Sequence, residues 1–147
     1  MAEDDVRLKA WSALLGAQAL VRRRVEGRLK AAGLPSVAWY DVLWELERAG
    51  GELRIGELAE RLVIEPYNAT RLLDRVESEK LLRREKAAED KRGARAVLTD
   101  AGRALRRRMW PVYKRAIEEV FAQPLSKSQA QAMVRGLAKV IASVRRE

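Results

Sequence analysis

The chain has 147 residues, of which 48% are hydrophobic, and it carries 30 Lys and Arg against 21 Asp and Glu, a net charge of +9. This length and composition are typical of one folded protein domain, and the positive charge suits a polyanionic partner. The lack of cysteine and histidine excludes disulfides, thiolate or imidazole metal sites and triads with a histidine base, so we expect no cofactor and no enzyme. No run approaches the roughly 20 apolar residues of a membrane span, and the acidic start lacks the apolar core of a secretory signal, so we expect a cytoplasmic protein.

Helical periodicity covers the first third of the chain. Apolar residues recur at helical spacing over residues 6–29 and predict a first helix, which Gly33 and Pro35 end. Ser36 is placed to cap a second helix, and the pair Gly50-Gly51 stops it.

Two short amphipathic helices follow. Residues 52–54 form a minimal strand or a turn, and residues 55–62 form a short helix. After a tight connection, Pro66 begins another helix that runs to about Lys80, because proline is favourable in a first helical turn. Two helices joined in this way predict a helix-turn-helix.

A basic hairpin comes next. Residues 81–87 and 94–98 are predicted strands, and the polar turn 89–93 joins them. A hairpin directly after a helix-turn-helix is a wing.

The last part of the chain is helical. Thr99 or Asp100 caps a long helix that continues towards Phe121, and Pro111 within it is expected to kink or divide it. Ser126 opens a final helix. The predicted fold class is therefore mainly α: a winged helix-turn-helix with N- and C-terminal dimerisation helices and a small β-hairpin wing.

This order of elements, with the motifs at 70–75 (TRLLDR), 90–93 (DKRG) and 98–102 (LTDAG), resembles the MarR family of bacterial transcriptional regulators. The resemblance covers nearly the whole chain. It implies a DNA-binding winged helix-turn-helix at residues 35–100, flanked by dimerisation helices at 1–34 and 101–147.

The second helix of the helix-turn-helix is expected to enter the major groove of DNA. If its apolar stripe faces the core, a set of polar residues projects outward. Asn68 has the amide geometry to read adenine, and Arg71 has the geometry to read guanine or hold phosphate. Phosphate contacts are expected from Tyr67 and Thr70. The outward-facing and neighbouring candidates are Tyr67, Asn68, Thr70, Arg71 and Arg75.

A structural role is the alternative for two of these residues. Thr70 would then back the helix, and Arg75 would pair with Glu79 four residues later.

The wing supplies further candidates, Lys91, Arg92 and Arg95. An arginine at a hairpin tip suits a narrow minor groove, and the sequence leaves open whether Arg92 or Arg95 has this role. The resemblance also allows Arg92 to brace the wing against Glu65. The run 106–108 fits a solvated helix face better than a DNA contact.

Apolar stripes on the first and the last two helices exceed what one small winged module can cover. The resemblance implies that they interlock in a two-fold homodimer. Such a dimer would read a pseudo-palindrome with half-sites about 10 base pairs apart.

The resemblance also implies a small aromatic or phenolic effector bound near the dimerisation helices. The candidate pocket residues are Trp11, Trp39, Tyr40 and Trp44. Aromatic residues at this spacing more often belong to a protein core than to a ligand pocket.

These inferences favour a sequence-specific, ligand-responsive repressor that binds double-stranded DNA in the nucleoid and has no membrane partner. The alternative is an architectural DNA-binding protein without an effector, which would bind with little sequence preference and a steep salt dependence. A basic protein at an acidic membrane or protein surface ranks last, because the hairpin has no role there.

Overall fold

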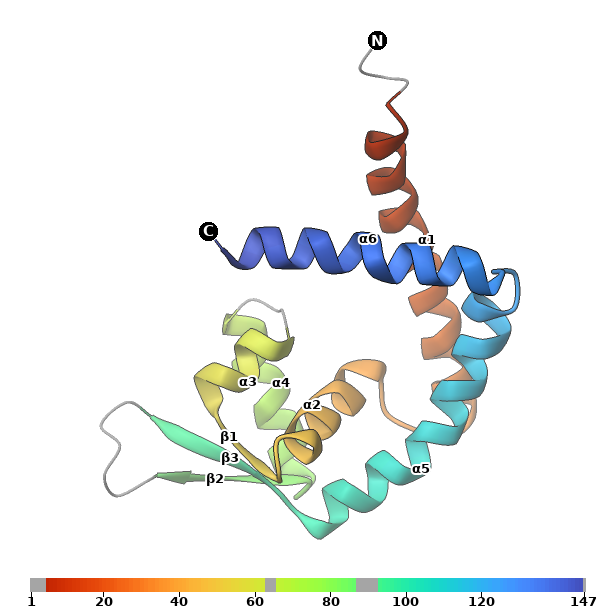
Figure 1. Cartoon of the computed structure of the whole chain (residues 1–147). Coiled ribbons are helices and arrows are strands. Elements are labelled where there is room, and N and C mark those ends of the chain that lie inside the picture. The colour runs from red at the N-terminus through yellow and green to blue at the C-terminus, as the bar shows by residue number, and fades with distance from the viewer. Residues whose placement is uncertain (1–4, 63–65, 87–92, 147) are drawn as a thin grey trace. The chain divides into compact units, whose positions relative to one another are not determined.

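The computed structural model describes residues 5–62, 66–86 and 93–146. The chain divides into two compact units, one formed by Glu26–Tyr113 and the other by Met1–Val25 with Lys114–Glu147. Two long helices, α1 (Val6–Ala31) and α5 (Asp100–Ile117), contribute residues to both units (Figure 1).

The unit Glu26–Tyr113 is a winged helix. Its sheet is antiparallel in the order β1-β3-β2, with Leu53 opposite Ala96 and Leu82 opposite Leu98. β2 and β3 run side by side and project beyond the helices of the unit (Figure 1). The predicted fold class is thus confirmed. The central elements of the winged unit are α2 (Val37–Arg48), β1 (Glu52–Arg54), α3 (Ile55–Leu62), α4 (Pro66–Ser78), β2 (Leu82–Lys86) and β3 (Ala94–Leu98).

Local capping sets the ends of α2. The Ser36 hydroxyl oxygen accepts a hydrogen bond from the Ala38 N–H (3.2 Å), and Glu26 Oε1 of α1 accepts one from the Val37 N–H (2.8 Å). At the other end, Gly50 and Gly51 have φ of 91° and 108°, a region that favours glycine. The sequence predicted both the Ser36 cap and the glycine stop, and both are confirmed.

Apolar side chains from every central element of the winged unit form its core. Leu43 and Leu46 of α2, Leu58 of α3 and Val76 of α4 have no exposed surface. Burial of this kind is the main favourable term in folding. The other buried core residues of these elements and of α5 include Val42, Leu53, Leu73, Leu82, Ala96, Leu98, Leu105 and Met109.

Thr99 joins three segments of the winged unit. Its hydroxyl donates a hydrogen bond to the Lys80 carbonyl (2.7 Å) and accepts one from the Gly102 N–H (3.0 Å), which caps α5. Lys80 itself has φ of 60°, uncommon for a residue other than glycine, at the turn between α4 and β2. Of the two predicted caps for this helix, the structure assigns the role to Thr99.

Pro111 does not divide α5, so a kink, the other predicted effect, stays a prediction. The helix continues through Pro111 to Ile117, and a π-helical turn over Glu118–Ala122 follows it. Proline removes one N–H donor, and the buried Met109 two residues earlier anchors the helix.

The second unit ends with α6 (Lys127–Arg145). A reciprocal capping box begins this helix: the Ser126 hydroxyl accepts from the Gln129 N–H (3.1 Å), and Gln129 Oε1 accepts from the Ser126 N–H (3.0 Å). No residue of α6 is buried. None of the described helices has the length and apolarity that a membrane-spanning segment requires.

Candidate nucleic-acid interface

Helix α4 has one buried face and one polar, exposed face. Ala69, Leu73 and Val76 lie in the core. Tyr67 and Arg71 are on the exposed face, and Tyr67 is 70% exposed. The other predicted residues of this helix, Asn68, Thr70 and Arg75, are also exposed.

Arg71 rests on an aromatic neighbour. Its guanidinium carbon lies over the ring of Tyr67, 5.6 Å from the ring centroid. The two residues are four apart, the spacing at which side chains meet on a helix. The structure describes both Arg75 and Glu79, and no ion pair joins them. The Arg75 carbonyl accepts a hydrogen bond from the Ser78 hydroxyl (2.6 Å).

Arg84 ties the wing to helix α4. Its guanidinium donates to Asp74 Oδ1, and its backbone N–H donates to Glu77 Oε2 (2.8 Å). Asp74 and Glu77 both belong to α4, whereas Arg84 is in β2. Sequence reasoning missed this link, although an Asp and a Glu three residues apart on α4 share a helix face that a strand arginine could bridge.

Of the three predicted wing residues, the structure describes only Arg95. Lys91 and Arg92, and the proposed brace between Arg92 and Glu65, lie outside the described residues. Arg95 is in β3, between the two outer strands, and its register partners are Arg54 of β1 and Glu85 of β2. Its guanidinium pairs with Glu52 of β1 at 3.5 Å, a cross-strand ion pair in which both side chains are more than one-third exposed.

The three arginines of the run 106–108, within α5, differ in exposure. Arg106 pairs with Glu47 of α2 and lies over the Trp44 ring, 5.3 Å from its centroid. Its side chain is only 14% exposed. Arg107 and Arg108 are exposed, so the prediction of a solvated face fits these two and not Arg106.

An aromatic cluster joins α2 to α5 beside this ion pair. Tyr40 stacks on Trp110 with ring centroids 5.9 Å apart, and its centroid is 4.9 Å from that of Tyr113. Burial raises the pKa of the Tyr40 hydroxyl, and Arg106 opposes part of that rise. The sequence prediction missed Trp110 and Tyr113, which follow Arg106 at four and seven residues and therefore share its helix face.

The predicted ligand residues differ in exposure and in the unit to which they belong. Tyr40 is buried in this cluster, and Trp44 is 39% exposed beside Arg106. Trp39 is half-buried on the same helix, and Trp11 belongs to the other unit.

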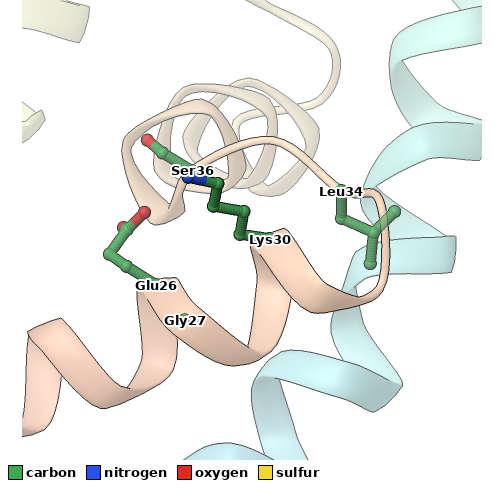
Figure 2. Close-up of a pocket in the computed structure, with 5 residues that line it drawn as sticks. All are labelled: Glu26, Gly27, Lys30, Leu34 and Ser36. Atoms are coloured by element: carbon green, nitrogen blue, oxygen red, sulfur yellow. The ribbon is translucent and has the colours of Figure 1, made fainter.

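A separate pocket of about 280 Å³ lies where α1 leads into α2. Glu26 and Lys30 extend from α1 towards the segment that carries Ser36 (Figure 2). Gly27 and Leu34 complete the lining, which includes none of the four predicted aromatic residues.

Comparison with known proteins identifies relatives of this chain. A sequence profile described as MarR family matches residues 32–93. A MarR family transcriptional regulator from Silicibacter pomeroyi is 30% identical, with a TM-score of 0.77, covering 100% of this chain and 97% of that one. AbsC, a MarR family transcriptional regulator from Streptomyces coelicolor, is 25% identical with a TM-score of 0.84, and 97% of each chain is covered.

A further relative was solved in complex with DNA. It is Sco3205, a MarR family transcriptional regulator from Streptomyces coelicolor, 25% identical with a TM-score of 0.85, covering 98% of this chain and 92% of that one. No curated protein gives a match. With 30% identity over nearly its full length to one such regulator and the family profile across its winged helix, the chain belongs to the MarR family of transcriptional regulators.

Proposed function

We propose that this regulator is a homodimeric repressor that reads a pseudo-palindromic operator through the exposed face of α4. The observation that carries the proposal is the division of α4 into a core face and a polar face that presents Tyr67, Asn68 and Arg71. An asparagine amide can bond the N6 and N7 of adenine, and an arginine can bond the O6 and N7 of guanine. The relative that was solved in complex with DNA supports DNA binding by this fold.

The wing adds a contact outside the major groove. Because Arg95 lies within β3 and not in the turn of the hairpin, we assign the minor-groove role to Arg92 and a phosphate role to Lys91. Both residues lie outside the described part of the chain. An arginine in a narrow minor groove gains from the enhanced negative potential there.

Control by a small aromatic or phenolic effector is part of the proposal. Trp44 and Trp110 are 39% and 40% exposed, and they offer stacking surfaces near the Arg106 cation. Such a ligand would release the DNA if it bound more tightly to a conformation unfit for the operator.

The experiment compares two duplexes: one selected by the wild-type protein from a randomised pool, and a shuffled duplex of the same composition. Fluorescence anisotropy across a salt series is expected to give a preference of about 10³-fold or more for the selected duplex at physiological salt. Equal affinities that fall together with salt would instead identify an architectural DNA-binding protein.

Arg71→Ala is expected to weaken binding to the selected duplex by about 10- to 100-fold, because one bidentate base contact contributes about 1–3 kcal/mol. Binding to the shuffled duplex should weaken far less. Arg107→Ala removes the same charge from an exposed helix position and should change both affinities little. An equal loss on both duplexes for Arg71→Ala would place Arg71 on phosphate and contradict base reading.

The dimer is proposed to form through residues 1–34 and 101–147. Helix α6 has no buried residue. Four of its apolar side chains are each more than half exposed: Val134, Val140, Ile141 and Val144. On α1, Trp11 is 61% exposed. A second copy of the chain would cover this apolar surface.

Val140→Glu is expected to weaken dimerisation by at least about 100-fold, because it places a charge in the proposed apolar interface. Sedimentation equilibrium at micromolar concentration measures the effect. Gln131→Glu introduces the same side chain elsewhere on α6 and should leave the dimer intact. A monomeric wild-type protein, or a Val140→Glu protein that dimerises normally, would contradict the proposal.

A further inference from the structure

We propose that Tyr67 is a positioning residue that aims Arg71 at a base, an inference that rests on the proposed function. Arg71 is on the exposed face of α4, where a long side chain samples many rotamers. A side chain that must first be ordered loses affinity when it binds. The ring of Tyr67 restricts this freedom, because the guanidinium already lies over it.

The neighbouring ion pair explains why Arg71 rests on a ring and not on an acid. Asp74 is three residues after Arg71, a spacing at which an Asp-Arg pair can form on a helix. Asp74 is instead bound to Arg84 of the wing, whose side chain is 26% exposed. The wing thereby occupies the nearest acid on α4, and Arg71 is left to stack on Tyr67.

Stacking keeps the arginine suited to base reading. The N–H donors of a guanidinium lie in its plane, so in the proposed arrangement, with the flat face of Arg71 turned to the Tyr67 ring, the donor edge is free. A carboxylate partner would occupy that edge, which a guanine needs for a bidentate contact. Tyr67 is 70% exposed, so the stacked pair is open to a nucleic acid.

A double-mutant cycle tests the inference with the selected and shuffled duplexes. Tyr67→Leu is expected to reduce the preference for the selected duplex by about three- to fivefold, the range of a surface cation–π contact. In the Arg71→Ala background the same substitution should change the preference less than twofold. Tyr67→Phe keeps the ring and should restore most of the preference that Tyr67→Leu loses.

Two outcomes would overturn it. A Tyr67→Phe protein that loses as much preference as Tyr67→Leu would show that the hydroxyl itself discriminates between the duplexes, which would make Tyr67 a direct base contact. An unchanged effect of Tyr67→Leu in the Arg71→Ala background would mean that the two residues act independently. A wild-type protein without any preference between the duplexes would instead refute the proposed function, so the two failures are distinguishable.

Discussion

Gly102→Ala is expected to destabilise the winged unit by about 3 kcal/mol. A Cβ at this buried position would overlap the Leu81 carbonyl oxygen and lie 2.7 Å from Leu98 Cδ1. Neither neighbour can retreat easily, because the Leu81 carbonyl accepts the Thr99 N–H (3.2 Å) and Leu98 is in the core. Forcing extra volume into a packed site of this kind generally costs about 1–3 kcal/mol, and a backbone neighbour places the cost at the upper end.

Equilibrium urea denaturation followed by circular dichroism measures this loss. Gly56→Ala is the matched control, because Gly56 is also helical, belongs to the same unit and has no neighbouring atom within 4 Å of the Cβ that alanine would add. Its stability should be unchanged or rise by up to about 1 kcal/mol, since alanine favours helix over glycine. A Gly102→Ala protein as stable as the Gly56→Ala protein would mean that α5 shifts away from the Leu81 carbonyl at little cost.

Local rules predicted most of the fold. Capping and turn residues act within a few positions of themselves, so Ser36, Gly50 and Ser126 marked helix ends correctly. Periodicity of two or 3.6 residues likewise located the strands and helices. The order of elements then allowed only the winged helix-turn-helix.

Side-chain partners between elements could not be predicted in the same way. The run 106–108 contains three identical arginines, and only the packing of α5 against α2 distinguishes Arg106 from the others. The pairing of Arg95 with Glu52 depends on sheet order, because β1 is next to β3 only in the folded sheet. The sequence could not decide between a kink and a division at Pro111, because tertiary packing can override a local preference against helix, and α5 is continuous through this residue.

Replacing Arg106 is expected to lower stability by about 2 kcal/mol. Arg106→Ala would leave Glu47, whose side chain is only 19% exposed, with the more distant Arg103, whose Nε is 3.9 Å from Glu47 Oε1. Removing one partner of a buried ion pair is strongly destabilising, and the partial exposure of both groups reduces the effect. The substitution also removes the guanidinium that covers the Trp44 ring, and the packing of its aliphatic stem.

The same helix provides two controls for this experiment. Arg107→Ala and Arg108→Ala make an identical chemical change at exposed positions and should alter the unfolding free energy by less than about 0.5 kcal/mol. Glu47→Gln in the Arg106→Ala background should recover part of the loss, because a partly buried amide needs less charge compensation than a carboxylate that keeps only the distant Arg103. If all three arginine variants unfolded at the same urea concentration, the Arg106–Glu47 pair would contribute nothing beyond a solvated charge. A loss confined to Arg106→Ala would instead show that one arginine of the basic run fixes α5 to α2, while its two neighbours are solvated.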